Sequence, residues 1–207
     1  MRSLGGELER PVVLLVGGAT GTGKSSVTTE VAHRLGITRV TSTDFIRETI
    51  RAFFAPQFMP SVHYSSFEGD PTIAGFIEQT HNVLVGVQAV LGRALAESWS
   101  IALEGVHLVP GLVPDEIEGA TIVRAVLRIE SEDVHRTHFE VRDEATGGTR
   151  AMEKYLSRID DIRAIQDYIV DSAERSGVPV IESTDRRRAV AELLDLVLRS
   201  VDSEVFA

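Results

Sequence analysis

Hydrophobic residues along the chain fall into short apolar runs that alternate with longer segments of helical spacing. The apolar runs predict strands over residues 11–16, 38–42, 99–103, 121–129 and 178–181. Apolar positions three and four residues apart predict helices over 24–35, 43–53, 72–98, 152–173 and 189–201, and Ser131 is positioned to cap a further helix. Because strands alternate with helices, we expect an α/β fold with a mostly parallel five-stranded sheet and helices on both faces.

The clearest helical pattern begins after residue 151. Its apolar residues share one face, and Gly177 ends it; they are Met152, Tyr155, Leu156, Ile159, Ile162, Ile165, Ile169 and Ala173. This pattern predicts a single helix packed on the core. Three segments instead carry proline, glycine or consecutive polar residues and predict irregular loops: 55–71, 105–119 and 142–150.

Composition narrows the class of protein. The chain has 207 residues, of which 43% are hydrophobic, and shows no repeat or linker, so we expect a single domain with its core over about 11–203. A net charge of -10 disfavours nucleic acid as a partner. Cysteine is absent and no apolar stretch is long enough for a bilayer, which predicts a soluble, cytoplasmic protein with no membrane partner.

One glycine-rich turn carries the strongest chemical signal. Residues 18–25, GATGTGKS, fit the pattern G-x-x-x-x-G-K-[ST] and lie between a predicted strand and a predicted helix, the context of a phosphate-binding loop. The backbone amides of such a loop surround a triphosphate, so we expect ATP to contact Gly18, Ala19, Thr20, Gly21, Thr22, Gly23, Lys24, Ser25 and Ser26. Lys24 would reach the β- and γ-phosphates, and Ser25 would offer its hydroxyl to Mg²⁺. The fold class expected is therefore a P-loop NTPase, a three-layer sandwich like that of nucleoside monophosphate kinases.

Two acidic residues are candidates for the chemistry beside that loop. Asp44 follows the second predicted strand, where it could accept a proton from an attacking hydroxyl, hold Mg²⁺ through water, or simply cap a helix. Glu104 ends an apolar strand and resembles a Walker B acid. We expect Ser25, Asp44 and Glu104 to form the Mg²⁺ site, and the pattern leaves open which carboxylate is the base.

Other polar residues are candidates for binding the second substrate, in a region of about 45–98. Arg47 and Arg51 are four residues apart and share a helix face, which suits a phosphate or carboxylate, although solvated arginines are the common alternative. Asp44 and Glu104 are candidates for this role as well, and the remaining ones lie in two predicted loops: His63, Tyr64, Ser65, Gly105 and His107. A single loop histidine is more often structural.

The segment after the fourth strand has the place of a mobile lid in small P-loop kinases, over about 136–154. Arg136, Arg142 and Arg150 would stabilise charge on the transferred phosphoryl group, and Gly147-Gly148 would supply a flexible tip. After the last strand, residues 183–185 (STD) would either line the adenine site or cap the final helix.

Five segments together resemble the 2-phosphoglycerate kinase family: GGATGTGKSS, TSTDFIRETIR, HYSSFE, LEGVHLVPG and KYLSRIDDIRAIQDYIVDSAERSGVPVIE. The resemblance extends from Val12 to about Glu182. It implies transfer of the γ-phosphoryl group of ATP to the 3-hydroxyl of 2-phosphoglycerate, which gives 2,3-bisphosphoglycerate and ADP; in archaeal members this product feeds cyclic 2,3-diphosphoglycerate. Longer members carry an extra N-terminal domain of regulatory type, and only ten residues precede the first predicted strand, so we expect no regulation of that kind.

The sequence therefore predicts an ATP-dependent kinase with Mg²⁺, acting on a small anionic acceptor, with Lys24, Asp44 and the lid arginines as catalytic residues. Three alternatives stay open: 3-phosphoglycerate as acceptor, a gluconate-, shikimate- or nucleotide-type kinase, and a nucleotide-gated binding protein with slow hydrolysis. A homodimer is equally open.

Overall fold

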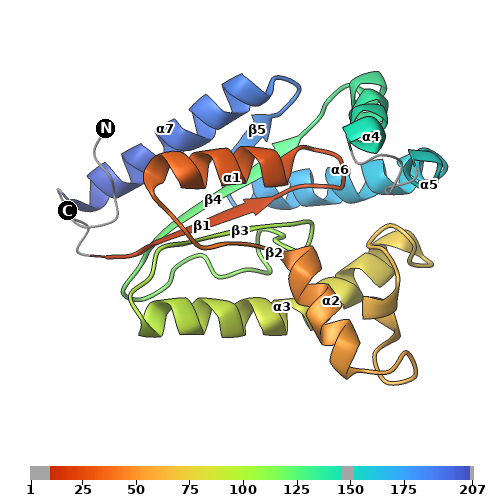
Figure 1. The fold of residues 1–207 in the computed structure, drawn as a ribbon, viewed down its shortest axis with the longest axis horizontal. Helices are drawn as coiled ribbons and strands as arrows, with labels where there is room; N and C mark the ends of the chain where they lie inside the picture. The colour runs from red at the N-terminus through yellow and green to blue at the C-terminus, as the bar shows by residue number, and fades with distance from the viewer. Residues whose placement is uncertain (1–9, 146–151, 206–207) are drawn as a thin grey trace.

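Five parallel strands form one sheet in the order β2-β3-β1-β4-β5 (Figure 1). The structure, a computed structural model, describes residues 10–145 and 152–205. The strands are β1 (Val12–Gly17), β2 (Val40–Ser42), β3 (Ile101–Glu104), β4 (Thr121–Arg128) and β5 (Val180–Glu182). The parallel five-stranded sheet predicted from the alternating pattern is confirmed.

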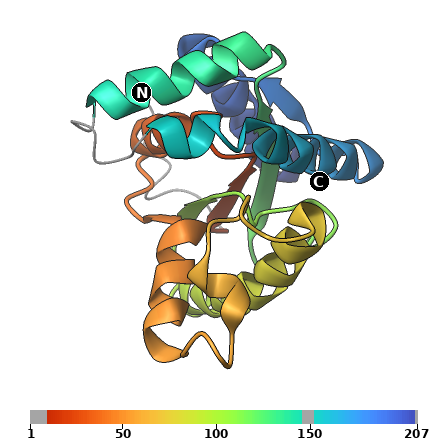
Figure 2. The same ribbon diagram turned by 90° about the vertical axis from the view of Figure 1, so that its right-hand side faces the viewer.

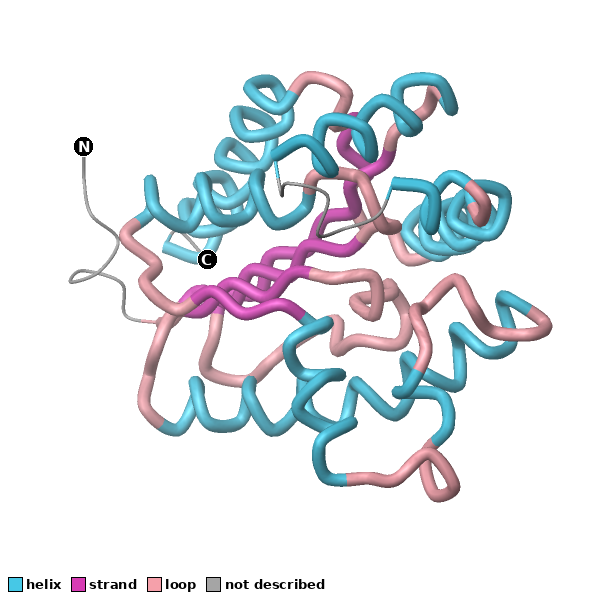
Figure 3. The backbone as a smooth tube through the Cα atoms, turned by 45° about the vertical axis from the view of Figure 1, so that its right-hand side comes forward, coloured by secondary structure: helices cyan, strands magenta, loops and turns pink. Residues whose placement is uncertain are grey.

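Helices cover both faces of this sheet and make a three-layer sandwich (Figures 1 and 3). Helices α1 (Lys24–Leu35) and α7 (Arg186–Val205) pack on one face, and α3 (Thr72–Ala96) and α6 (Ile159–Arg175) pack on the other. Side chains alternate along the buried central strand β1: Leu14 faces α1 and α7, whereas Leu15 faces α3. Burial on both faces explains why β1 reads as an unbroken apolar run.

Helix α3 is continuous over 25 residues despite its glycines. At Gly86 it approaches α2 (Thr43–Phe53) so closely that an added Cβ atom would lie 2.5 Å from Cγ2 of Ile46. At Gly92, in contrast, an added Cβ would meet nothing within 4 Å. The close packing at Gly86 fixes α2, whose first turn carries Asp44, against the rest of the domain.

The helix predicted over 152–173 is two helices, so that prediction is wrong in one respect. Helix α5 (Met152–Leu156) ends, and α6 begins after a break at Ser157 and Arg158. At the break the Arg158 guanidinium donates a 2.9 Å hydrogen bond to the carbonyl of Phe67 and pairs with Asp161. A helical wheel assumes one straight axis, and this tertiary contact has no signal in the periodicity.

The remaining elements flank the carboxyl ends of the strands. Helix α4 (Glu132–Ala145) and α5 lie on one side of these ends, and α2 with the short 3₁₀ helix η1 (Pro60–His63) lies on the other (Figure 2). Within the two described stretches of the chain, no helix combines the length and apolar character needed to cross a bilayer.

Candidate active site

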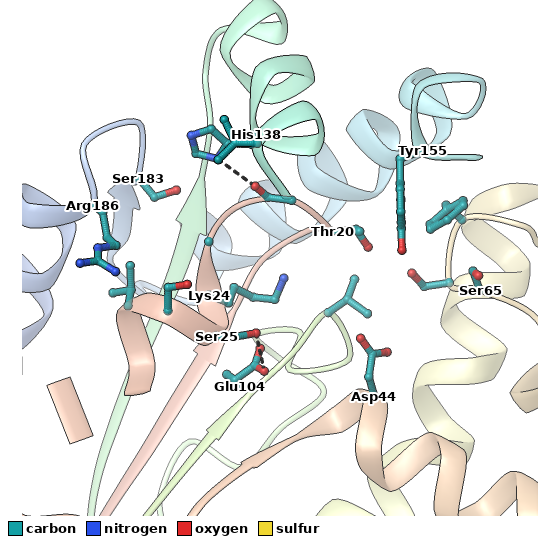
Figure 4. Close-up of a pocket in the computed structure, with 18 of the residues that line it drawn as sticks. Thr20, Lys24, Ser25, Asp44, Ser65, Glu104, His138, Tyr155, Ser183 and Arg186 are labelled. Atoms are coloured by element: carbon teal, nitrogen blue, oxygen red, sulfur yellow. Dashed lines mark hydrogen bonds between the residues drawn. The ribbon is translucent and has the colours of Figure 1, made fainter. Parts of the chain in front are cut away.

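A cavity of about 970 Å³ opens at the carboxyl ends of β1, β2 and β3. Open parallel sheets bind ligands at this edge. The residues that enclose the cavity come from the glycine-rich loop, from α1, α2, α4, α5 and α7, from the end of β3, and from the loops that follow α2, β3 and β5 (Figure 4). They are Thr20, Gly21, Gly23, Lys24, Ser25, Ser26, Val27, Asp44, Arg47, Ser65, Ser66, Phe67, Glu104, Val106, His138, Val141, Tyr155, Ser183, Thr184 and Arg186.

The glycine-rich loop connects β1 to α1 as the motif predicted. Six of its nine predicted ATP residues line the cavity: Thr20, Gly21, Gly23, Lys24, Ser25 and Ser26. The other three, Gly18, Ala19 and Thr22, do not line it and have other positions in the loop. At Gly18, where φ is +140°, an added Cβ atom would lie 2.4 Å from the carbonyl oxygen of Leu127, so only glycine fits.

Lys24 is almost completely buried beneath the loop, with 9% of its surface exposed. Its Nζ donates a 2.6 Å hydrogen bond to the carbonyl of Ala19. Burial lowers the pKa of Lys24, and the negative charges of Glu104 and Asp44 oppose this shift. The negative charge of a phosphate chain in the cavity would likewise favour the charged ammonium of Lys24.

Glu104 ends β3 and is buried, with 6% exposed. Parallel pairing places it level with Val16 of β1 on one side and Ser42 of β2 on the other. The hydroxyl of Ser25 donates a 2.8 Å hydrogen bond to its carboxylate (Figure 4). The strand end and the phosphate-binding loop thus meet through these two side chains.

Asp44 lies in the first turn of α2 and faces the cavity, with 70% of its side chain exposed (Figure 4). The cap of this helix is Ser42, whose hydroxyl accepts a hydrogen bond from the amide of Phe45. Ser42, and not Asp44, therefore caps this helix. Its carboxylate is 3.8 Å from Nε of Arg47.

Arg47 lines the cavity, but most of its donors are directed to the protein. One terminal nitrogen donates to the carbonyls of both Val62 and Tyr64, each at 3.0 Å, and the other donates to Glu48. The forked guanidinium expected to bind an anion instead holds the loop that carries Ser65. Ser65, one of the predicted substrate residues, lines the cavity.

The other predicted substrate residues lie outside the cavity lining. Arg51 pairs with Glu48, and Nε2 of His63 is 2.8 Å from the carbonyl of Phe54. Tyr64 contributes its carbonyl to Arg47. At Gly105, a Cβ atom would lie 1.8 Å from Oγ1 of Thr43, so this glycine permits close packing behind the site.

His107 is also placed in the interior, where none of its surface is exposed. Its Nδ1 is 2.8 Å from the Thr43 hydroxyl, and its Nε2 is 2.9 Å from the side-chain oxygen of Gln79. Burial lowers the pKa of His107 to about 4, and the cations Arg47 and Lys24 act in the same direction. The structure therefore gives His107 a neutral, structural position.

The predicted lid is described in part. Arg136 lies on α4, pairs with Glu132 on the same helix and does not line the cavity. The side chain of Arg142, all of Arg150 and the Gly147-Gly148 pair lie outside the described residues. Lys154, at the end of the predicted lid, contacts the Ser65 hydroxyl and the Glu68 carboxylate, both at 3.0 Å.

Residues 183–185, after β5, include a helix cap and two residues that line the cavity. Asp185 caps α7 by accepting hydrogen bonds from the amides of Arg187 and Arg188. Ser183 and Thr184 line the cavity together with Arg186. Sequence reasoning did not find Arg186.

Sequence reasoning also missed the aromatic wall of the cavity. The rings of Phe67 and Tyr155 are 5.7 Å apart, and Tyr155 stacks on Phe139 at 5.0 Å. Tyr155 belonged to the predicted apolar face of a helix, and that pattern does not distinguish a core residue from one that lines a cavity. His138 and Val141 of α4 had no distinguishing signal.

Several 2-phosphoglycerate kinases are similar to this chain over most of its length. It is 35% identical to the 2-phosphoglycerate kinase of Methanopyrus kandleri over 95% of the chain, 36% identical to that of Methanothermobacter thermautotrophicus over 94%, and 39% identical to that of Thermococcus kodakarensis over 92%. The chain belongs to the 2-phosphoglycerate kinase family. It spans 62%, 67% and 68% of the length of these three relatives. A comparison with protein-family models finds no match.

Solved structures confirm the fold expected for a member of this family. A shikimate kinase from Acinetobacter baumannii superposes with a TM-score of 0.53 at 15% identity, covering 92% of this chain and 94% of that one. A gluconokinase from Sinorhizobium meliloti superposes with a TM-score of 0.52 at 16% identity, covering 97% of this chain and 98% of that one. The chain therefore has the fold of P-loop small-molecule kinases.

The donor atoms at the loop suit the Mg²⁺ that accompanies ATP in such kinases. Ser25, Glu104 and Asp44 offer hard oxygen ligands on the cavity side. In the described part of the chain, no group of three or more His, Cys, Asp or Glu residues forms a metal cage. Mg²⁺ in such sites keeps several waters and is held by one or two protein oxygens together with substrate phosphates.

Proposed function

We propose that this protein transfers the γ-phosphoryl group of ATP to the 3-hydroxyl of 2-phosphoglycerate, giving 2,3-bisphosphoglycerate and ADP. The observation that carries the proposal is a single cavity that joins a phosphate-binding loop to the carboxylate of Asp44. Membership in the 2-phosphoglycerate kinase family supports the choice of acceptor. As a consumer of ATP, the enzyme would act in the cytoplasm.

The two ends of the cavity suit two different ligands. Arg186 and Ser183 lie at one end, Asp44, Ser65 and Tyr155 lie at the other, and Lys24 is between them (Figure 4). We place the nucleoside of ATP toward Arg186 and its phosphates on the loop, so that the γ-phosphate is directed toward Asp44. The acceptor would then approach from the end lined by Ser65 and Tyr155, opposite the leaving group.

The two carboxylates receive different roles in this arrangement. Asp44 is exposed to the cavity, so it would accept the proton that leaves the acceptor hydroxyl as the new phosphate ester bond forms. Glu104 is buried and already bonded to Ser25, so it would fix the Ser25 hydroxyl. Bound Mg²⁺, held by Ser25 with Glu104 and Asp44 through water, would neutralise phosphate charge.

The remaining residues hold the reactants and limit water. Lys24 would exchange its bond to Ala19 for the phosphate oxygens. Arg47 and the loop it holds would fix Ser65 and Ser66 against the acceptor. Tyr155 and Phe67 would form an apolar wall that reduces the access of water to the phosphoryl group.

Phosphorus NMR of the purified protein with ATP and Mg²⁺ tests this function. We expect a bisphosphoglycerate and ADP with 2-phosphoglycerate, and no bisphosphoglycerate with the Lys24→Ala variant. The rate with 3-phosphoglycerate and with glycerate, measured in parallel, identifies which isomer is used. Turnover with another small hydroxy acid alone would show a different kinase, and ATP hydrolysis that no acceptor accelerates would overturn the proposal.

A further inference from the structure

Four consecutive carbonyl groups of the phosphate-binding loop accept hydrogen bonds from side chains. The Ala19 carbonyl accepts from the Thr22 hydroxyl at 2.9 Å and from Lys24, and the Thr22 carbonyl accepts from the Ser183 hydroxyl at 2.8 Å. Between them, the carbonyls of Thr20 and Gly21 contact two imidazoles of α4. Nε2 of His135 is 2.8 Å from the Thr20 oxygen, and Nδ1 of His138 is 3.1 Å from the Gly21 oxygen.

Burial and ring stacking fix the His135 side chain in this position. None of its surface is exposed, and its ring stacks on Phe139 at 5.2 Å, with Phe139 stacked in turn on Tyr155 of the cavity wall. Within the described part of the chain, its Nδ1 has no hydrogen-bond partner. The contact to a carbonyl requires the proton on Nε2, so His135 donates to the Thr20 oxygen, and its buried Nδ1, unpartnered among the described residues, fits a neutral ring. Burial lowers the pKa of His135 to about 4, which keeps the ring neutral near pH 7.

The loop packs closely against His135 and Phe139 at Gly21. At Gly21, with φ of +89°, an added Cβ atom would lie 2.8 Å from Nε2 of His135 and 2.6 Å from the Phe139 ring. The loop and α4 are 115 positions apart in sequence at the Thr20 contact. The Thr20 carbonyl thus contacts a donor on an element far away in sequence.

A peptide group that turns its carbonyl outward presents its neighbouring amide inward. Backbone amides bind phosphate oxygens only when they converge, and the carbonyls must then find donors on the outer side of the loop. A buried carbonyl without a donor would favour rotation of the peptide out of this arrangement. The donors on the outer side therefore determine how well the inner side binds an anion.

We propose that His135 is a positioning residue for the nucleotide: its neutral imidazole fixes the Thr20 carbonyl outward and so preorganises the loop amides for the phosphates. His138 acts in the same way on Gly21 while also lining the cavity. The inference rests on the proposed function, since it assumes that the loop binds ATP. It assigns to α4 a role in ATP affinity that the motif itself does not contain.

Two substitutions separate positioning from structural support. His135→Phe keeps an aromatic ring to stack on Phe139 but removes the donor, whereas His135→Gln loses the ring but can place an amide N–H near the position of Nε2. We expect His135→Phe to weaken ADP binding about tenfold, the effect of one lost hydrogen bond, and His135→Gln to weaken it less. The melting temperature should follow the opposite order, because only Phe keeps the stack.

The experiment is calorimetric titration of ADP and ATP into each folded variant, with melting temperatures measured on the same samples. Gln79→Leu is the control. Gln79 is buried and donates to the carbonyls of Ser61 and Tyr64, so its loss destabilises the loop that carries Ser65. It does not contact the phosphate-binding loop in these hydrogen bonds. We expect this control to leave ADP affinity unchanged. Equal ADP affinity in wild type and His135→Phe, or an affinity order that follows the melting temperatures, would overturn the inference. Absence of nucleotide binding in the wild type would instead contradict the proposed function.

Discussion

The Ser25 hydroxyl and the Glu104 carboxylate are 79 positions apart in sequence and joined by a 2.8 Å hydrogen bond. The bond connects the first turn of α1 to the end of β3, so it links the loop that holds phosphate to the strand end beside it. Glu104 also raises the pKa of Lys24 against the effect of burial. One buried carboxylate thus acts on two groups of the phosphate site.

Glu104→Gln should therefore reduce turnover without preventing nucleotide binding. The amide oxygen can still accept from Ser25, but the negative charge that supports Lys24 and Mg²⁺ is lost. We expect kcat to fall about 100-fold, within the range for loss of one preorganised electrostatic group. Steady-state kinetics over a range of Mg²⁺ concentrations, with ADP titrated in EDTA, measures both effects. Unchanged kcat would contradict the role given to Glu104.

Asp44→Asn should remove the proposed proton acceptor. We expect kcat to fall about 100-fold or more, with ADP affinity changed less than about threefold, since general bases contribute on this scale. The measurement is kcat and ADP affinity on the same preparation. Glu48→Gln on the same helix is a matched control, because it removes one carboxylate that does not line the cavity. An equal fall in kcat for Asp44→Asn and Glu48→Gln would show that the loss of negative charge, and not of a proton acceptor, causes the effect.

Arg47→Lys should raise the KM of the acceptor by about tenfold and leave ADP affinity unchanged. Lysine cannot reproduce the fork that donates to the Val62 and Tyr64 carbonyls, so the loop carrying Ser65 would lose its support. Steady-state kinetics with varied acceptor tests this expectation. Arg51→Lys, one turn later and paired only with Glu48 in the described contacts, should behave as wild type. A fall in ADP affinity for Arg47→Lys would place this residue on the nucleotide instead.

Acid should destabilise the fold through His107 and His135. The pKa of each is lowered from 6.5 to about 4 in the folded protein, mainly by burial. Between these values the unfolded chain binds protons that the folded chain does not. The free energy of unfolding should therefore fall as the pH falls from 6.5 toward 4, by about 1.4 kcal/mol per pH unit for each histidine.

Urea denaturation at several pH values across this range measures the slope. His107→Phe should reduce the slope by about half of the combined contribution of the two histidines. A slope that His107→Phe leaves unchanged would show that this imidazole titrates normally in the folded state.

Two glycines of α3 should respond oppositely to alanine. Gly92→Ala adds a methyl group in open space and should stabilise the helix by about 0.5 to 1 kcal/mol. Gly86→Ala places the same methyl group against Ile46, where α2 must move, and should destabilise by about 1 to 3 kcal/mol. Chemical denaturation of the two variants compares them directly. Equal changes in the free energy of unfolding would contradict the close packing of α2 against α3 at Gly86.

The parts of the site that could be predicted were those written in neighbouring residues. The glycine-rich motif fixed the positions of Lys24 and Ser25, because a phosphate-binding loop is local backbone geometry. Asp44 and Glu104 were found because each follows an apolar strand, and parallel strands bring such residues to one edge of the sheet. For the same reason the strand and helix order predicted the parallel sheet.

Contacts between distant segments were beyond these patterns. Arg47 and Arg51 share a helix and a charge, yet only Arg47 reaches the cavity, because the 62–64 loop folds onto it. His107 looked like a loop residue and proved to be interior, and the break at Arg158 depends on a carbonyl 91 positions away.

The sequence by itself determined the order of strands and helices and the phosphate-binding loop, since both depend on short-range spacing and on the conformations that glycine allows. Only the tertiary structure decided which polar side chains face the cavity, which donate to distant carbonyls, and that α4 supplies two histidines to the loop. The physical reason is that a side chain's partners depend on how segments pack, and hydrophobic spacing specifies which face is buried without specifying what that face meets.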